Sequence, residues 1–357
     1  MRHVLNYLPF DSHVHFRRGA MLKAVAPFTA KQCWGAVVMP NTATPHILTP
    51  EDAVTYKEEI LGTVGETFSP IITGYLAPAT TYHDVRRGFK SGAWHAMKVY
   101  PPGATTHSNE GVMAHFLPEH PVLPAMQDMG MPLLLHPEVT YDKMGFLADI
   151  YDREKLFLDT IRVLRKKYPK LRISVEHVTD RETARFMMEM GDPEYLVCTV
   201  TPQHMLFDRR DLHKDGFQPH LFCYPILKRQ ESKEAVLELA TSGLPFVSAG
   251  TDSAPHPTHA KEKACGCAGG VFSAPRMIEL YTEIFEKAGK LANLEEFLCV
   301  NGPRFYGVSP KGGMLVLEKG LNTLDALVEV ENDDKIRPFG YHEDPKQRYQ
   351  FQWTIAE

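Results

Sequence analysis

The chain has 357 residues, of which 43% are hydrophobic and 23% are charged, and its formal net charge at pH 7 is -5. This composition is typical of a soluble globular protein with a large core, and it excludes an intrinsically disordered chain. The charge is small for this length and no run of like charges occurs, so neither nucleic acid nor an anionic membrane surface is an expected partner. A small-molecule substrate is the better expectation, and the length allows either one large barrel or two domains.

The six cysteines are scattered along the chain without the spacing of an extracellular disulfide framework, which predicts reduced thiols and a cytoplasmic protein. One CxC pair, Cys265 and Cys267, has no second pair to complete a metal site. The N-terminal segment has no apolar stretch followed by a small-residue cleavage site, and no uninterrupted span of about 18 apolar residues occurs. We therefore expect no export signal and no membrane-spanning helix.

Short apolar runs recur along the chain, separated by helical patterns. Eight of these runs are expected to be strands: residues 5–10, 34–40, 70–76, 94–100, 131–136, 171–177, 195–200 and 244–252. The clearest helical pattern between them has apolar or aromatic residues on one face at Phe157, Ile161, Leu164 and Tyr168. Alternation of strand and helix favours an α/β protein with a parallel sheet. Eight strands without strict polar alternation favour a (β/α)8 TIM barrel over an open doubly wound sheet, which remains the alternative.

The end of the chain departs from this alternation. Residues 231–243 and 274–289 still have the pattern of amphipathic outer helices on either side of the last strand. Beyond about residue 310 the pattern loosens into a charged stretch, EVENDDKIRPF, and the remaining residues are too few for a large core of their own. We expect a single barrel domain over residues 1–357, with 310–357 as a C-terminal extension packed on the barrel.

Histidines and other polar side chains stand at or near the ends of the predicted strands. His13 and His15 are two residues apart, so on a strand both imidazoles point the same way, at roughly 7 Å spacing. Later strands end near four further groups, Lys98, His136, His177 and Asp252. The C-terminal ends of barrel strands share the face on which active sites form. Four imidazoles and a carboxylate are ligands that zinc accepts, and they exceed the needs of one ion, which predicts two metals.

Each of these residues also has an ordinary structural explanation. A single histidine on an apolar strand is more often a hydrogen-bonded core residue than a metal ligand. Lys98 by itself could be an ion-paired side chain, and Asp252 by itself could cap a helix or form a turn, because Ser253 and Pro255 follow it. The placement of all six residues at strand ends argues against six independent accidents.

Nine short motifs occur in the order HVHFR, MPNT, MKVYPPGATTHS, LLLHPEVT, EHVTD, TPQHM, YPILKR, GTDSAPH and CGCAGG. In this order they resemble the dihydroorotase family of the amidohydrolase superfamily, in the type that forms bacterial homodimers. The resemblance extends from about residue 7 to 310 and is specific, because general superfamily members share only the histidines, lysine and aspartate. It implies a metal-dependent amidohydrolase barrel. Only twelve residues precede His13, so no N-terminal β-domain is expected.

The resemblance implies two Zn²⁺ ions per subunit. The ligands would be, for one ion, His13, His15 and Asp252 and, for the other, His136 and His177. Lys98, carboxylated on its amine, would bridge both ions together with a hydroxide, because a carbamate offsets the metal charge that a free ammonium would repel. The hydroxide would attack the ring amide carbon, and Asp252 would act as general acid and base.

The implied reaction is the reversible, zinc-dependent cyclisation of N-carbamoyl-L-aspartate to (S)-dihydroorotate plus water, the third step of de novo pyrimidine biosynthesis, in a cytoplasmic homodimer. The substrate carries a carboxylate, for which Arg17 offers a bidentate guanidinium and Asn41 an amide donor. By spacing alone, Arg17 could equally form a surface salt bridge. The resemblance adds His256 to this cluster, and the full set of implied substrate contacts is His15, Arg17, Asn41, Thr105, Thr106, His136, Tyr224, His256 and Ala268.

Two of these contact groups would act in particular ways. Tyr224 and Ala268 would meet the ring edge of the substrate through their main chains. The family usually has an aliphatic residue at the position of Tyr224, a change that a main-chain contact tolerates. Thr105 and Thr106 lie in a loop that would close over the substrate, exclude water and place two hydroxyls on the carboxylate.

Two other functions remain as alternatives. A hydantoinase-like hydrolase of uncharged cyclic imides would use the same metals, but its substrate has no carboxylate to occupy Arg17, Asn41 and His256. A catalytically inactive barrel that serves as an assembly partner would be expected to have lost ligands, and the sequence retains all of them.

Overall fold

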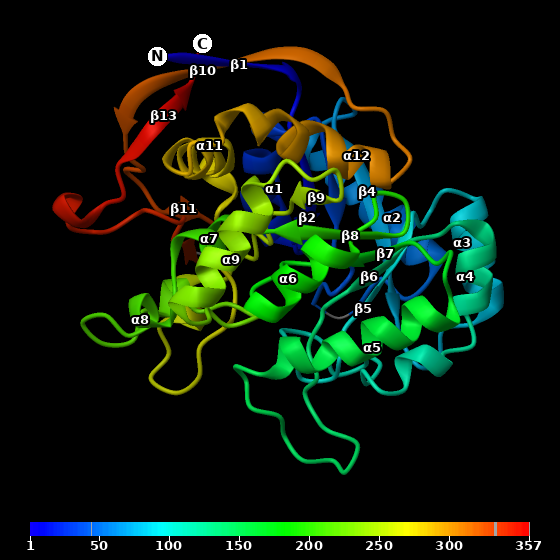
Figure 1. Ribbon diagram of the computed structural model, residues 1–357. Helices are drawn as coiled ribbons and strands as arrows, with labels where there is room; N and C mark the ends of the chain where they lie inside the picture. Colours follow the sequence, from blue (N-terminus) through cyan, green and yellow to red (C-terminus); the bar gives the residue numbers. More distant parts are fainter. Residues whose placement is uncertain (44, 332–333, 357) are drawn as a thin grey trace.

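The structure is a computed structural model that describes residues 1–43, 45–331 and 334–356. Its centre is an eight-stranded parallel sheet in which each strand pairs with the next one along the chain (Figure 1). The strands, in sheet order, are β2 (Phe10–Val14), β3 (Gly35–Val38), β4 (Ser69–Leu76), β5 (Ala96–Val99), β6 (Leu133–Leu135), β7 (Ile173–Val175), β8 (Leu196–Val200) and β9 (Val247–Ala249). The two edges meet, because Val14 forms a parallel bridge with Ser253, just beyond β9. The predicted (β/α)8 barrel is confirmed.

The barrel strands are buried on both faces, which explains why their sequences do not alternate between polar and apolar residues. Every strand residue except Ser69 is buried. Side chains that point inward fill the barrel, and those that point outward are covered by helices. The strands also carry buried polar side chains, among them Asp11, His13 and Lys98, which depend on partners inside the barrel.

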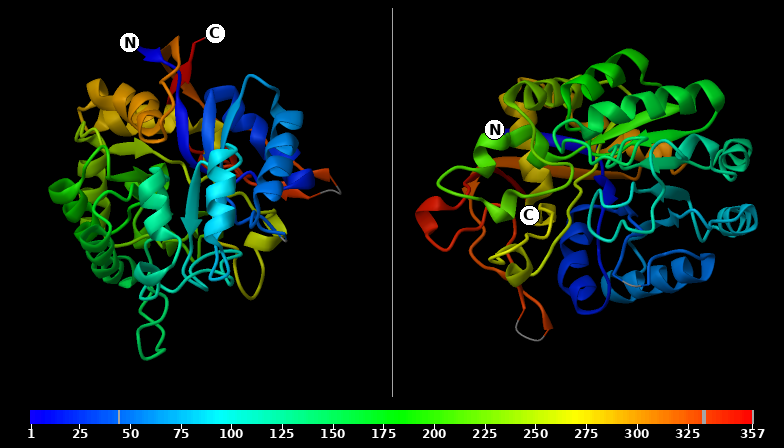
Figure 2. Two further views of the ribbon diagram at one scale, coloured as in Figure 1. Left: turned by 90° about the vertical axis from the view of Figure 1, so that its right-hand side faces the viewer. Right: turned by 90° about the horizontal axis from the view of Figure 1, so that it is seen from below.

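Helices surround the barrel (Figure 2). The longer ones are α1 (Gly19–Gln32), α2 (Pro50–Val64), α3 (Tyr82–Lys90), α4 (Leu123–Met129), α5 (Arg153–Lys167), α6 (Arg181–Met190), α9 (Gln230–Thr241) and α11 (Met277–Lys287). Shorter helices are α7 (Pro202–Leu206), α8 (Arg209–Leu212), α10 (Thr258–Lys261) and α12 (Asn301–Phe305). Helix α5 buries Phe157, Ile161 and Leu164, as its periodicity predicts. Among the described residues, no helix has both the length and the apolar character needed to cross a membrane.

Short helical turns complete the connections between these elements. Within the described residues, 3₁₀ turns cover Leu117–Glu119, Pro219–Leu221, Ala274–Arg276, Leu291–Asn293 and Pro345–Gln347, and a π-helical turn covers Glu296–Val300. The turn at Ala274–Arg276 leads directly into α11. The predicted helix 274–289 is therefore a 3₁₀ turn followed by an α-helix.

The first seven residues do not belong to the barrel. Strand β1 (Arg2–Tyr7) pairs antiparallel with β10 (Gly312–Asn322), which also pairs with β13 (Phe351–Ile355). This small sheet lies at the edge of the molecule where both termini are found (Figures 1 and 2). The predicted run 5–10 therefore divides: its beginning is in β1, and the barrel strand begins only at Phe10. The N-terminal strand joins C-terminal strands in a sheet that sequence patterns did not indicate.

The segment after residue 310 contacts the barrel through α11. Trp353 is fully buried, and its indole Nε1 donates a hydrogen bond to Glu286 at 2.9 Å. The hydroxyl of Tyr349 donates to Glu283, also at 2.9 Å. A further antiparallel pair, β11 (Val328–Glu329) and β12 (Lys335–Ile336), lies in the same segment. The organisation of residues 1–357 as one domain stays a prediction.

Candidate metal centre and substrate pocket

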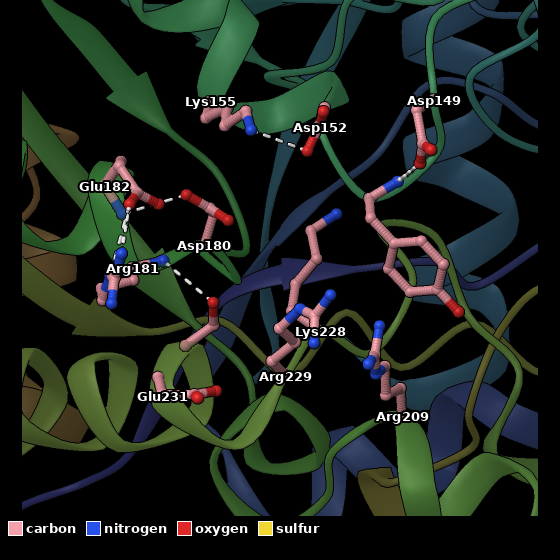
Figure 3. Close-up of a pocket in the computed structure, with 12 residues that line it drawn as sticks. Asp149, Asp152, Lys155, Asp180, Arg181, Glu182, Arg209, Lys228, Arg229 and Glu231 are labelled. Atoms are coloured by element: carbon pink, nitrogen blue, oxygen red, sulfur yellow. Dashed lines mark hydrogen bonds and ion pairs between the residues drawn. The ribbon is translucent and has the colours of Figure 1, made fainter.

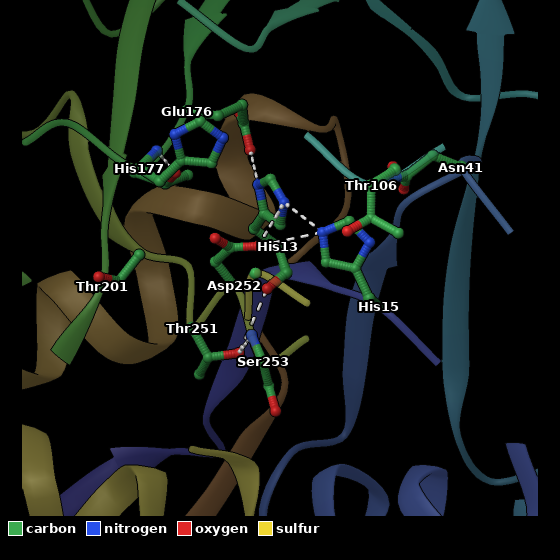
Figure 4. A network of polar contacts seen from close by, with 12 residues as sticks. His13, His15, Asn41, Thr106, Glu176, His177, Thr201, Thr251, Asp252 and Ser253 are labelled. Carbon is green, nitrogen blue, oxygen red and sulfur yellow. Dashed lines mark hydrogen bonds and ion pairs between the residues drawn. The ribbon is translucent and has the colours of Figure 1, made fainter. Parts of the chain in front are cut away.

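Three potential metal ligands converge where β2 and β9 end. Nε2 of His13 lies 3.3 Å from Nε2 of His15, and Oδ1 of Asp252 lies 3.3 Å and 3.0 Å from these two nitrogens (Figure 4). All three residues are buried. The backbone of Asp252 has a φ of 45°, a left-handed conformation that is unusual for aspartate and aims its side chain at the histidines. This group of a carboxylate and two imidazoles has the donor chemistry of a zinc site.

Asp11 and Thr251 hold this group in register. The Asp11 carboxylate accepts hydrogen bonds from the Thr251 N–H at 2.9 Å, from its hydroxyl at 2.6 Å and from the His13 N–H at 3.1 Å. Asp11 is fully buried, and burial raises its pKa to about 6 despite these hydrogen bonds. The contacts join β2 to the residue immediately before Asp252, so they set the distance between the two histidines and the carboxylate.

His136, His177 and Lys98 lie beside the first group. The ring centroid of His177 is 5.1 Å from that of His13 and 4.6 Å from that of His136, so the His177 ring neighbours both. Nε2 of His136 donates to Oε2 of Glu138 at 3.0 Å, which leaves its Nδ1 for another partner. Nζ of Lys98 and Nδ1 of His177 are buried and have no hydrogen-bond partner among the residues that the structure describes. The structure thus brings together all six residues that the sequence placed at strand ends.

Most of these groups have the protonation states that metal ligands need. Burial lowers the pKa of His15 to about 3 and also lowers the pKa values of His136 and His177. Burial would raise the pKa of Asp252, but hydrogen bonds from His13 and His15 hold it well below its usual range. At neutral pH these imidazoles are neutral and the carboxylate is ionised, as metal binding requires.

His13 is the exception. Burial and the charge of Lys98 would lower its pKa, but hydrogen bonds with Asp252 and Glu176 outweigh them and raise it. Its Nδ1 donates to the buried Glu176 carboxylate at 2.6 Å, which leaves Nε2 facing His15 and Asp252. A metal ion at Nε2 would compete with a proton for that nitrogen.

The predicted carboxylate-binding residues form two separate sets of contacts, one around Arg17 and one around Asn41. Nη2 of Arg17 lies 3.1 Å from Nε2 of His256, and Nε of Arg17 donates to the Pro255 carbonyl at 3.2 Å. On the other side, the Asn41 amide donates to the Thr106 carbonyl at 3.0 Å. The loop that carries Thr105 and Thr106 is therefore tied to the end of β3, near the His15 side of the metal group (Figure 4).

Tyr224 and Ala268 differ in whether their main-chain N–H and carbonyl groups already form hydrogen bonds. Among the described residues, no hydrogen bond engages the N–H or carbonyl of Tyr224. The Ala268 N–H donates to the Ala260 carbonyl at 3.1 Å, and the Ala268 carbonyl accepts from Lys261 at 2.8 Å. The two segments touch, because a side chain at Gly269 would come within 2.4 Å of the Tyr224 ring. A larger residue at that position would force the Tyr224 ring to shift.

Several residues of the site were not identified from the sequence. Glu176 directly precedes His177, and Glu138 follows His136 by two residues, so the carboxylates in SVEH and LLLHPE were available signals. The Tyr100 hydroxyl donates to Asn41 at 2.9 Å and fixes the orientation of that amide. No local pattern indicates this contact, because it joins strands β3 and β5, which are not adjacent.

A separate cavity of about 720 Å³ is lined by residues other than those of the histidine group (Figure 3). It is formed by loops that follow β6, β7 and β8, with acidic and basic side chains in equal number. Several of these charges pair with each other, for example Lys155 with Asp152 at 2.8 Å and Arg181 with Glu182 at 2.9 Å. The histidine group is absent from its lining, so this cavity is not the metal centre.

Sequence comparison gives long matches at high identity. The chain is 45% identical over 314 residues to a dihydroorotase of Halorhodospira halophila, with 87% of this chain and 88% of that protein covered. It is 41% identical over 334 residues to a dihydroorotase of Salmonella heidelberg, with 93% of both chains covered. The chain belongs to the dihydroorotase family. No protein-family profile matches it.

Solved structures of the dihydroorotase family agree with this assignment. A dihydroorotase of Campylobacter jejuni superposes with a TM-score of 0.86 at 32% identity, over 100% of this chain and 98% of that one. The Saccharomyces cerevisiae dihydroorotase in complex with 5-fluoroorotic acid gives 0.90 at 27% identity, over 99% and 98% of the two chains. An L-hydantoinase of Arthrobacter aurescens gives 0.75 at 15% identity, over 93% and 85% of the chains, which is a likeness of fold alone.

Proposed function

We propose that this member of the dihydroorotase family closes N-carbamoyl-L-aspartate to (S)-dihydroorotate, and opens the same ring in reverse, at a centre of two zinc ions. The observation that carries the proposal is the buried group of His13, His15 and Asp252 beside a fully buried, unpartnered Lys98. A dihydroorotase function follows the family, and the arrangement of these residues supports a metal-dependent hydrolysis of a cyclic amide.

The residues fit a pair of metal ions. In the proposed site, one ion is held by His13, His15 and Asp252 and the other by His136 and His177, with Lys98 shared between them. Burial lowers the pKa of Lys98 to about 8, although Glu176 and Asp252 act to raise it. A neutral amine is the form that reacts with carbon dioxide, and the resulting carbamate is an anion able to bridge two cations. An unmodified lysine ammonium at this place would instead repel the two metal cations.

The metals, when bound, supply Lewis acidity toward the ring carbonyl and lower the pKa of water toward neutrality. The protein supplies the proton transfer. Asp252 uses Oδ1 toward His13 and His15, and no hydrogen bond from a described residue engages Oδ2. Oδ2 is therefore free to take a proton from the attacking water and to return it to the departing ring nitrogen. In the direction of ring closure the same carboxylate carries the proton the other way.

The proposed carboxylate pocket consists of Arg17, Asn41 and His256. Burial lowers the pKa of Arg17 but leaves a cation in a site with few competing anions. In the absence of substrate its Nη2 faces His256, and a substrate carboxylate offers a better, charge-assisted partner. Thr105 and Thr106 close over this end of the substrate, while His15 and His136 flank the reacting ring and Tyr224 and Ala268 meet its edge through the main chain.

The test compares three rings. Metal-replete protein is given dihydroorotate, dihydrouracil and hydantoin, and ring opening is followed by ultraviolet absorbance. We expect turnover of dihydroorotate and little of the two uncharged rings, because only dihydroorotate has a carboxylate for Arg17. A preference for either uncharged ring contradicts the proposed substrate. Intact-mass measurement under native conditions adds a check on Lys98, since carboxylation adds the mass of one carbon dioxide.

The homodimer belongs to the same proposal. It is carried from the family, and light scattering after size-exclusion chromatography tests it directly. We expect a mass of twice the chain, and a monomer at micromolar concentration contradicts it. A small-molecule substrate remains the expected partner, without nucleic acid or membrane.

A further inference from the structure

Lys261 is a buried cation that the proposed reaction does not use. It is the last residue of α10, and only 3% of its surface is exposed. Its Nζ donates to three main-chain carbonyls: Phe222 at 2.9 Å, Ala268 at 2.8 Å and Gly270 at 2.7 Å. An ammonium has three protons, so its donor capacity is fully used. Among the described residues, no acidic side chain forms an ion pair with it.

The three carbonyls come from two different segments. Phe222 lies two residues before Tyr224, and Ala268 and Gly270 lie on either side of Gly269. The Gly270 N–H also donates to the Phe222 carbonyl at 2.9 Å, so this carbonyl receives both a neutral and a charged donor. Lys261 therefore joins the two segments that the proposed function places against the ring edge of the substrate.

The contacts continue toward the carboxylate pocket. Between the two carbonyls bound by Lys261, the Gly269 carbonyl lies 3.0 Å from Nε2 of His256, which in turn lies 3.1 Å from Arg17. Three consecutive carbonyls, at residues 268, 269 and 270, are thus held by Lys261 and His256. The positions of the ring-edge segment and of His256 depend on each other through this one stretch of backbone.

The charge of Lys261 is surrounded by three main-chain carbonyls and not by a carboxylate of a described residue. A buried lysine is rare without an acidic partner, because taking an ammonium out of water is costly. Burial accordingly lowers the pKa of Lys261 to about 8. Charge-assisted hydrogen bonds are shorter and stronger than neutral ones, and three of them hold loop backbone in one geometry more firmly than apolar packing does.

We propose that Lys261 is a positioning residue that holds the Phe222–Tyr224 and Ala268–Gly270 segments at the spacing needed to bind the substrate ring. This inference rests on the proposed function, because that function supplies the ring. It assigns Lys261 no part in the chemical step. Its loss should therefore weaken ground-state binding and leave the rate of the bound complex largely intact.

The test uses Lys261→Met in the full-length, metal-loaded enzyme, which keeps the length of the side chain and removes its charge and donors. We expect KM for dihydroorotate to rise at least about tenfold while kcat falls by less than about threefold. Zinc content should match the parent protein. Lys167→Met is the matched control, because Lys167 also donates to a carbonyl, of Pro118 at 2.9 Å, but pairs with Glu119 at the surface.

Hydrogen exchange gives a readout that does not depend on activity. In Lys261→Met, peptides covering 219–226 and 264–271 should exchange faster, while a peptide from α5 should be unchanged. If the Met variant does not fold, Lys261→Gln, which keeps an amide donor, is measured in its place with the same expectations. An unchanged KM in the folded variant overturns the inference, and so does unchanged exchange in both peptides. If the parent protein does not turn over dihydroorotate, the proposed function fails, and the exchange experiment still tests whether Lys261 holds the Phe222–Tyr224 and Ala268–Gly270 segments in place.

Discussion

Nδ1 of His13 lies 2.6 Å from Oε2 of Glu176, although the two residues are 163 positions apart. Glu176 is fully buried and follows β7, whereas His13 belongs to β2 on another side of the barrel. A carboxylate on the second nitrogen of a ligating histidine fixes its tautomer and makes it a better ligand. The contact therefore links metal affinity to a residue that need not touch the metal.

We expect Glu176→Gln to weaken metal binding by about 10–100-fold, because the amide cannot hold the imidazole as a carboxylate does. Competition with a chromophoric chelator measures the affinity. Glu194→Gln is a suitable control, since Glu194 is an exposed residue before β8. An affinity equal to that of the parent protein would remove Glu176 from the centre.

Asp252→Asn should abolish proton transfer while keeping the size of the side chain. We predict that kcat falls by about 10²–10⁴-fold in both directions of the reaction, with zinc largely retained through the histidines. Turnover and metal analysis on the same sample separate the two effects. Asp159→Asn, on the exposed face of α5, is the control. Near-parental rates in the Asp252 variant contradict the proton-transfer role.

Arg17→Met should weaken the binding of dihydroorotate. Loss of hydrogen bonds to a charged group costs about 1.5–3 kcal/mol, so we expect KM for dihydroorotate to rise by about 10–100-fold. Steady-state kinetics measure this change. The neighbouring Arg18, which pairs with Glu59, gives the control Arg18→Met. If KM does not change, Arg17 does not bind the substrate carboxylate.

Asp180, at the start of α6, should make stability depend on pH. Burial and the neighbouring Glu154 raise its pKa to about 8, well above the usual value of an aspartate. The native state thus holds the Asp180 proton more tightly than the unfolded state does. Protonated Asp180 therefore contributes favourably to the free energy of unfolding at low pH, and this contribution is lost as pH rises toward 8. Asp180→Asn is neutral at every pH and keeps the helix cap on the Glu182 N–H.

The variant should therefore melt above the parent protein at pH 8, with a difference that narrows toward pH 5. Each kcal/mol gained in the free energy of unfolding raises Tm by roughly 2 °C, and calorimetry measures this shift. Asp208→Asn provides a control of opposite sign, because hydrogen bonds from Arg210 and Lys233 hold the pKa of Asp208 below its usual value. A Tm difference for Asp180→Asn that does not vary with pH contradicts the prediction.

The sequence by itself determined the repeating elements and the residue types of the metal group. Apolar runs mark buried strands because both faces of a parallel barrel strand are covered, and the period of Phe157, Ile161 and Leu164 marks a helix. His13, His15, Lys98, His136, His177 and Asp252 were predicted together because strand ends in a barrel share one face, and the structure groups His13, His15 and Asp252 as potential ligands of one metal. These are local patterns joined by one general rule of topology.

Only the tertiary structure decided which distant groups meet. Strand β1 pairs with β10 from the other end of the chain, and Glu176 bonds His13 across the barrel. The sequence around Lys261 gives no sign of burial, yet the loops bury this lysine against three carbonyls. Strands and helices produce a regular spacing of apolar residues that the sequence shows. Residues brought together by the folding of distant loops have no fixed spacing in the sequence, so their contacts cannot be predicted from it.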